Sequence, residues 1–144
     1  MTGFKADLPD ANVWLALTVS DHRHHTAAQT WVTERKNLPL VFCRVTQMAL
    51  LRLLTTPAVM GDQICSQKDA WKIHDAAMSR PGTHLMSDPP KPEAVWRART
   101  SRPHPAPKMW TDMYLAAFAH GHNLRLVTFD KAFRQLSEIE SLVL

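Results

Sequence analysis

Three aspartates beside short apolar runs are the residues of this sequence best suited to chemistry. Asp10 lies in LPDANVW, Asp112 in TDMYLAAFA and Asp130 in LRLVTFD. In an open parallel sheet, the carboxyl ends of the strands meet at one crevice, where ligands bind. Three carboxylates that meet there repel one another unless a divalent cation neutralises them, and Mg²⁺ or Mn²⁺ suits such oxygen ligands. A metal held in this way beside a phosphodiester predicts hydrolysis of nucleic acid.

Each aspartate also has an ordinary structural explanation. Asp10 or Asn12 can cap a short helix, and Asp130 can cap a helix that follows it. Asp112 falls in the first turn of a predicted helix, where the helix dipole favours a carboxylate. Thr128 precedes Asp130 by two residues, so strand alternation sends both side chains to one face, where the hydroxyl can orient a water or Asp130. The chemical interpretation therefore depends on convergence of the three carboxylates.

Short strands that alternate with helices must position these residues. The predicted strands are residues 4–8, 38–43, 83–86, 124–129 and 141–144. The predicted helices are residues 12–19, 20–36, 46–55, 69–78, 109–120 and a short one from Lys131. A further helix at 93–99 is an option within the proline-rich, basic segment 89–107. The alternation predicts an α/β sandwich around a parallel sheet, with residues 1–144 as one domain.

Local signals predict where several of these elements begin and end. Ser20 or Asp21 is expected to cap the second helix. Gly121 is expected to stop the helix that begins near residue 109. Asp7 and Pro9 weaken the pattern of the first strand, although proline is tolerated at strand margins.

The composition is that of a globular protein with a moderately basic surface. Lysine and arginine outnumber the acidic residues 17 to 13, which gives a net charge of +4 and a pI near 9.4. This balance favours a polyanionic partner only slightly. The N-terminus lacks the apolar core of a secretory signal, and no apolar run approaches the ~20 residues that a membrane span needs. We therefore expect a soluble, cytoplasmic protein.

The eight histidines and two cysteines do not form a recognisable zinc motif. His22 and His25 have helical spacing, but the sequence contains no H-E-x-x-H pattern. Cys43 and Cys65 belong to no C-x-x-C pair. Surface histidines and reduced thiols are the favoured interpretation.

Four motifs occur in an order that resembles the PIN-domain ribonucleases, and more closely the toxins of VapBC-type toxin–antitoxin pairs. They are D-x-N at 10–12, T-Q-x-x-x-L-R-L-L at 46–54, T-D-x-Y-L-A-A at 111–117 and L-V-T-F-D at 126–130. The resemblance implies a three-layer α/β/α fold and an Mg²⁺- or Mn²⁺-dependent endoribonuclease. Its metal-binding acidic cluster corresponds to Asp10, Asp112 and Asp130, with Thr128 as an auxiliary catalytic group.

The sequence departs from the resemblance at Gln47. Many relatives carry a glutamate at the corresponding position, and a neutral amide offers an oxygen without a charge. Gln47 is still expected to belong to the catalytic set, with weaker metal affinity as the consequence. Asp88 is a candidate substitute, although a turn residue before two prolines is the favoured explanation for it.

Basic and aromatic residues near these motifs are candidates for RNA contacts. Phosphate contacts position a nucleic acid without reading its sequence. The substrate-binding candidates are Asn12, Arg44, Arg102 and Lys108. Trp96 and Trp110 can stack on unpaired bases, but packing is the favoured role for both.

The resemblance also implies partners. They are an RNA substrate, a cognate antitoxin and a second copy of the chain in a homodimer, with translation inhibited by RNA cleavage. Two alternatives remain at this point. One is a catalytically impaired PIN-like module that binds RNA or protein, and the other is a PIN nuclease of RNA processing.

Overall fold

A parallel sheet forms the centre of the computed structural model, which describes residues 3–35, 38–136 and 138–144. Its strands lie in the order β3-β2-β1-β4-β5, and every neighbouring pair is parallel. The strands are β1 (Asp7–Pro9), β2 (Leu40–Phe42), β3 (Thr83–Leu85), β4 (Arg125–Thr128) and β5 (Ser141–Val143). Because all strands run the same way, the residues that follow them share one edge of the sheet, called the carboxyl edge below.

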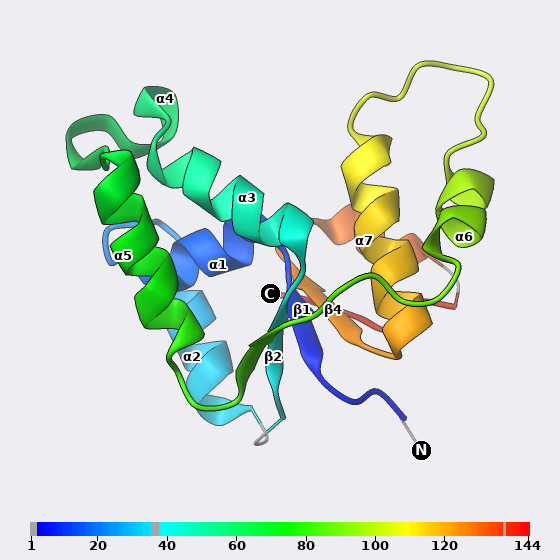
Figure 1. Cartoon of the computed structure of the whole chain (residues 1–144), viewed down its shortest axis with the longest axis horizontal. Helices are drawn as coiled ribbons and strands as arrows, with labels where there is room; N and C mark the ends of the chain where they lie inside the picture. Colours follow the sequence, from blue (N-terminus) through cyan, green and yellow to red (C-terminus); the bar gives the residue numbers. More distant parts are fainter. Residues whose placement is uncertain (1–2, 36–37, 137) are drawn as a thin grey trace.

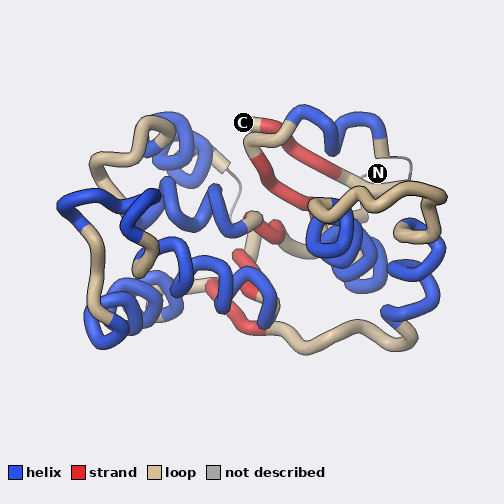
Figure 2. The backbone as a smooth tube through the Cα atoms, turned by 90° about the horizontal axis from the view of Figure 1, so that it is seen from above, coloured by secondary structure: helices blue, strands red, loops and turns tan. Residues whose placement is uncertain are grey.

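Helices cover both faces of this sheet (Figures 1 and 2). One side carries α1 (Ala11–Thr18), α2 (His25–Glu34), α3 (Arg44–Leu54), α4 (Pro57–Met60) and α5 (Gln67–Met78). The other side carries α6 (Pro92–Arg99) and α7 (Met109–His122), and the 3₁₀ turns are η1 (Gly61–Gln63) and η2 (Lys131–Gln135). The predicted three-layer α/β/α fold is confirmed. None of the helices in the described segments has the length and apolar content needed to cross a bilayer.

Alternating side chains of the strands divide the core into two halves. Phe42 of β2 packs on the α1 side, where its ring stacks on Trp14 with centroids 3.9 Å apart. Val41, the residue before it, packs on the α7 side together with Phe118. This alternation follows from the two-residue period of a strand and explains why both faces of the sheet need helices.

The first strand begins later than predicted and includes its proline. β1 starts at Asp7 rather than at residue 4, and Pro9 pairs with Val127 of β4. On its other side β1 pairs with β2 at Asp7↔Leu40. Proline has no N–H to donate, so the ladder on the β2 side ends before Pro9.

The predicted start of the second helix is wrong. Neither Ser20 nor Asp21 caps it, because α2 begins at His25. A turn comes first, in which the His22 N–H donates to the Val19 carbonyl at 3.0 Å. His22 therefore lies outside the helix and does not share a helical face with His25. The predicted end at residue 36 lies outside the described residues.

The predicted stop at Gly121 is also wrong, since α7 continues through Gly121 to His122. The C-cap is Asn123, which adopts the left-handed conformation with φ of 58°. A Cβ at position 121 would lie 2.6 Å from Cγ of Pro89. Glycine is needed here because the loop after β3 crosses α7 at close range, and not because the helix ends.

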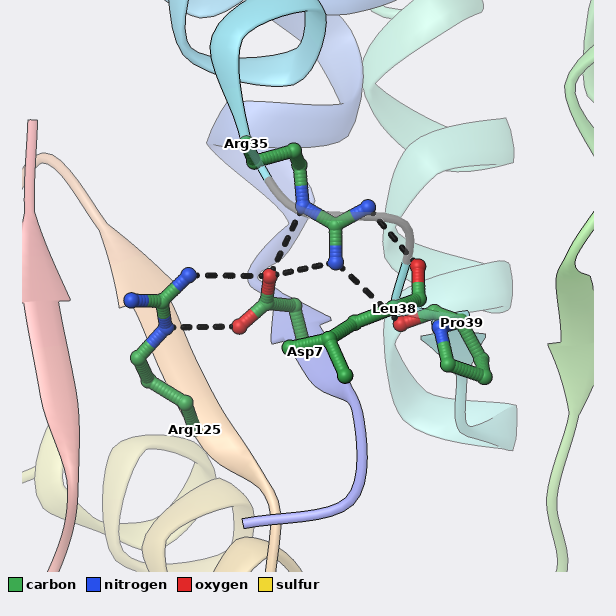
Figure 3. Close-up of polar contacts among 5 residues, drawn as sticks. All are labelled: Asp7, Arg35, Leu38, Pro39 and Arg125. Carbon is green, nitrogen blue, oxygen red and sulfur yellow. Dashed lines mark hydrogen bonds and ion pairs between the residues drawn. The ribbon is translucent and has the colours of Figure 1, made fainter. Parts of the chain in front are cut away.

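A buried ionic cluster fixes the start of β1, at the end of the strand opposite to Asp10 (Figure 3). The Asp7 side chain is fully buried, and its Oδ2 accepts from Nη2 of Arg35 at 2.6 Å. Its Oδ1 accepts from Nε of Arg125 at 2.7 Å. Arg35 also donates to the carbonyls of Leu38 and Pro39. The residue that weakened the strand pattern therefore ties β1 to β4 and to the end of α2.

Candidate functional site

Asp10 stands immediately after β1 and holds a fixed orientation at the carboxyl edge. Its Oδ1 accepts the N–H of Val13 at 3.0 Å, so Asp10 is the N-cap of α1. Its Oδ2 accepts the Thr128 hydroxyl at 2.6 Å. The capping role and a chemical role are therefore compatible, because each carboxylate oxygen keeps a further lone pair.

Thr128 connects two of the aspartates through one buried hydroxyl. The Oγ1 atom that donates to Asp10 accepts the backbone N–H of Asp130 at 3.0 Å. The Asp130 carboxylate caps η2 by accepting the N–H of Ala132 at 2.9 Å. The hydroxyl thus orients the Asp10 side chain and the Asp130 backbone, and not the Asp130 carboxylate. The side chain of Thr128 fixes the geometry between the ends of β1 and β4.

Asp112 lies in the first turn of α7, and this helix covers the face of the sheet opposite to α1 (Figure 1). Burial raises the pKa of Asp112, the negative charge of Asp130 raises it further, and Lys108 lowers it. Burial also raises the pKa of Asp10; hydrogen bonds from Thr128 and Val13 oppose that rise, and the charge of Asp112 adds to it. Asp112 therefore interacts electrostatically with both Asp10 and Asp130. The structure brings the three carboxylates together.

A hollow of about 240 Å³ opens beside this acidic group. Two of the three carboxylates line it, and Arg102 supplies a positive charge at its wall. Its lining residues are Arg102, Met109, Asp112, Met113, Asp130, Ala132, Phe133, Gln135 and Leu136. Of the substrate-binding candidates, Arg102 and Lys108 lie at this site, and Asn12 is exposed in the first turn of α1.

Gln47 forms hydrogen bonds with Arg44 and His74. Its Oε1 accepts Nη1 of Arg44 at 2.5 Å, and its Nε2 lies 3.2 Å from Nε2 of His74. An amide nitrogen only donates, so Nε2 of His74 accepts and its Nδ1–H donates to Asp75 at 2.9 Å. Gln47 and His74 are both buried. Within the described residues no hydrogen bond joins Gln47 to the three aspartates.

Asp88 lies in the loop that crosses α7 and pairs with a residue of that helix. The hydroxyl of Tyr114 donates to Oδ1 of Asp88. Both residues line a second hollow together with Arg44. Asp88 is therefore neither a simple turn residue nor a member of the group formed by Asp10, Asp112 and Asp130.

The two tryptophans on this side have different environments. Nε1 of Trp96 donates to the Trp110 carbonyl at 2.8 Å, which ties α6 to α7. The Trp96 ring also meets Tyr114 edge-on, with centroids 5.9 Å apart. Trp110 leaves 53% of its surface exposed. Packing between α6 and α7 accounts for Trp96, whereas about half of the Trp110 surface is open to solvent.

The donors at the acidic group are chemically suited to a hard cation, although they do not enclose one. No three His, Cys, Asp or Glu side chains in the described ranges are arranged so that together they hold a metal ion. Mg²⁺ is usually bound through one or two carboxylates, with waters and substrate phosphates as its other ligands. Burial, to which repulsion between the carboxylates adds, raises the pKa of Asp10 and that of Asp112, and a bound cation would stabilise their charged forms. The residues present therefore fit such an ion.

Neutralising Asp112 is expected to stabilise the protein. At pH 7 Asp112→Asn should raise the free energy of unfolding by about 0.5 kcal/mol, since partial burial and the charge of Asp130 both disfavour the ionised carboxylate. The pKa of Asp112 is higher in the folded than in the unfolded protein. The ionised carboxylate therefore lowers the free energy of unfolding at pH values above the folded-state pKa. This loss disappears well below the unfolded value of 3.8, where the carboxyl is protonated in both states. Urea unfolding at pH 7 and at pH 2.5 measures the difference at both limits. An equal difference at both pH values would show that ionisation of Asp112 is not its cause.

Sequence comparison finds a family model and several relatives that match most of this chain. The family model described as PIN domain matches residues 8–139. Ribonuclease VapC41 of Mycobacterium tuberculosis is 44% identical over 139 residues, which cover 92% of this chain and 94% of the relative. Ribonuclease VapC39 of the same organism is 30% identical over 125 residues, covering 87% of this chain and 88% of the relative.

Solved structures share the fold at low sequence identity. VapBC2 from Rickettsia felis, bound to a DNA fragment from its promoter, aligns with a TM-score of 0.67 at 11% identity. The alignment covers 96% of this chain and 98% of that one. VapC20 of Mycobacterium tuberculosis, a toxin that cleaves the sarcin–ricin loop, aligns with a TM-score of 0.67 at 12% identity over 93% and 98% of the chains. These two structures support the three-layer fold alone.

Proposed function

The chain belongs to the PIN-domain family, among the VapC ribonucleases, and from this membership we propose that it is an endoribonuclease and the toxin of a toxin–antitoxin pair. The observation that carries the proposal is the convergence of Asp10, Asp112 and Asp130 at the carboxyl edge. Hydrolysis of RNA phosphodiester bonds, and with it inhibition of translation, is the proposed activity. The cytoplasm, where translation takes place, is its proposed location.

Mg²⁺ or Mn²⁺ is the proposed cofactor, held by Asp10, Asp112 and Asp130. When bound, such an ion lowers the pKa of a coordinated water and neutralises charge on the phosphoryl oxygens. The chain contributes preformed carboxylates, since Asp10 is fixed by Val13 and Thr128 before any ligand arrives. Preorganisation of this kind lowers the cost of reaching the transition state.

Asp112 is the best candidate for accepting the proton of the attacking water. Both oxygens of Asp10 already accept hydrogen bonds, and Asp130 caps η2. The Asp112 carboxylate lines the hollow with Asp130, beside the space that the phosphate and the water would occupy.

Arg102 and Lys108 are the proposed contacts to the RNA backbone at the acidic group. Arg102 lines the hollow with Asp112 and Asp130, and Lys108 is close enough to lower the pKa of Asp112. Their positive charges offset the repulsion between the carboxylates and an approaching phosphate. Asn12, exposed at the start of α1, is a further proposed contact.

Metal removal provides the test of this proposal. The purified chain, freed of antitoxin, is expected to cleave structured RNA with Mg²⁺ or Mn²⁺ and to lose cleavage in EDTA. Saturating Mg²⁺ should also raise the melting temperature by about 5–10 °C, because a ligand that binds only the folded state stabilises it. Absence of both cleavage and stabilisation would favour the impaired binding module instead.

An antitoxin and a second copy of the chain are the proposed protein partners. The Rickettsia felis structure is that of VapBC2 on promoter DNA, which supports an antitoxin as the partner of this chain too. Co-expression with the product of an adjacent small reading frame should restore growth that the chain alone arrests. Unrestricted growth without such a partner would favour the alternative role in RNA processing.

A further inference from the structure

A second hollow lies at the carboxyl edge, beside the acidic group. Its volume is about 360 Å³, within the range of small-molecule sites. Two charged side chains, a phenol and apolar atoms converge in it. Its lining residues are Arg44, Leu85, Met86, Ser87, Asp88 and Tyr114.

The topology places this hollow on the same edge of the sheet as the proposed site of cleavage, on the other flank of α7. Arg44 follows β2 and Asp88 follows β3, whereas Asp10 follows β1. Since β1, β2 and β3 are consecutive in the sheet, these residues succeed one another along the carboxyl edge. Tyr114 follows Asp112 by two residues, about half a helical turn, so α7 presents the two residues to two different hollows. A nucleic acid strand lying along this edge can occupy both.

The polar groups of the second hollow have defined hydrogen-bonding roles. Tyr114 donates to Asp88, and both burial and this bond raise the pKa of Tyr114, so the phenol remains a donor. An ionised carboxylate accepts only, and each of its oxygens accepts more than one bond. Arg44 gives one N–H to Gln47 at 2.5 Å, out of the five that a guanidinium carries. The hollow therefore offers a bidentate acceptor beside a cation.

We propose that this second hollow is a base-binding subsite that selects guanine in a single-stranded RNA, with Asp88 as its specificity-determining residue. The inference rests on the proposed function, because the nucleotide bound here neighbours the one at the acidic group. Asp88 accepts the N1–H and the 2-amino group of the base, and Arg44 contacts the adjoining phosphate. Leu85 and Met86 supply the apolar wall against which the base lies.

Guanine is the base whose Watson–Crick edge matches an acceptor-only carboxylate. It presents two adjacent donors, N1–H and the 2-amino group. Adenine and cytosine place a ring-nitrogen acceptor beside their single amino group, and uracil flanks its one N–H with two carbonyls. Each of these would set an unpaired acceptor against Asp88. A good bidentate contact separates the right base from the wrong one by about 10-fold or more.

Binding of short RNAs without metal tests the subsite. The probes are fluorescein-labelled pentaribonucleotides of uridine whose central base is G, inosine, A, C or U, measured by anisotropy in EDTA with the full chain. The G probe should bind about 10-fold more tightly than the A, C and U probes. Inosine lacks the 2-amino group and should lose several-fold relative to G. Asp88→Asn should abolish the preference, and Asp62→Asn, an exposed position in η1, is the matched control.

The outcomes separate this inference from the proposed function. Equal binding of all five probes, or a guanine preference that survives in Asp88→Asn, overturns the subsite even if the chain cleaves RNA. A guanine preference that Asp88→Asn removes supports the subsite even if no cleavage is found. Tyr114→Phe keeps the ring and removes the donor to Asp88, so a reduced preference in this variant supports the assigned geometry. An unchanged preference in Tyr114→Phe counts against it.

Discussion

Asp112→Asn is expected to lower RNA cleavage by about 1000-fold while the protein remains folded. Loss of one preorganised charged group from a catalytic site commonly costs about 10²–10³-fold, and this carboxylate has two proposed roles, as metal ligand and as proton acceptor. Asn keeps the size of the side chain but removes the charge that Asp10 and Asp130 repel. The same substitution should stabilise the fold slightly, so lost activity cannot be attributed to unfolding.

The measurement is single-turnover cleavage of a structured RNA at saturating Mg²⁺, with melting temperatures recorded in parallel. Asp62→Asn serves as the control, because it removes an exposed carboxylate from η1, which follows α4 across the molecule from α7 (Figure 1). Asp62→Asn should retain full activity. Retention of cleavage by Asp112→Asn within about 10-fold of the wild type would remove Asp112 from the proposed catalytic group.

Convergence of the three aspartates was predictable because each lies next to the end of a regular element. Apolar strands that alternate with helices predict a parallel sheet, and parallel strands bring their carboxyl ends to one edge. Asp10 and Asp130 follow two such strands, and these strands, β1 and β4, are direct neighbours in the sheet. The position of Asp112 in a first helical turn then places it above the same edge. Sequence-local patterns suffice for this part of the site.

Contacts between segments distant in sequence were not predictable in the same way. Gly121 has the ordinary signature of a helix end, and only the approach of Pro89 explains why the helix continues through it. Nothing in the segment around Gln47 indicates that its amide meets His74, which lies 27 residues away on α5. A pattern within one segment contains no information about which segment packs against it.

Asp7 is a second residue whose role depends on segments distant in the sequence. On its own, an aspartate in a short apolar strand resembles a defect in the pattern. Its two partners lie 28 and 118 residues further along the chain. A buried carboxylate requires paired cations, so a charged residue in a predicted central strand does indicate that arginines will be found beside it. The residue does not indicate which ones.

Asp7→Ala is expected to destabilise the protein by about 3–5 kcal/mol, the largest effect on folding that we predict. The substitution leaves Arg35, whose side chain is only 8% exposed, without the carboxylate that it contacts at 2.6 Å. It also releases Arg125, which joins Asp7 to β4 through bonds of 2.7 and 3.0 Å (Figure 3). Desolvation of an uncompensated guanidinium accounts for most of the cost.

Urea unfolding of Asp7→Ala and of Glu93→Ala compares the loss of a buried ion pair with the loss of an exposed one. The comparison shows whether burial of the pair determines the change in the free energy of unfolding. Glu93 pairs with Arg97 at 2.6 Å, as close as Asp7 lies to Arg35, but both side chains of that pair are about 70% exposed. Exposed pairs contribute at most about 1 kcal/mol, so Glu93→Ala should have little effect. Replacing the whole cluster, with Asp7→Leu, Arg35→Met and Arg125→Met together, should recover most of the stability lost in Asp7→Ala, since no buried charge then remains unpaired. Equal losses in the two single variants would mean that the Asp7 cluster contributes no more than a surface ion pair.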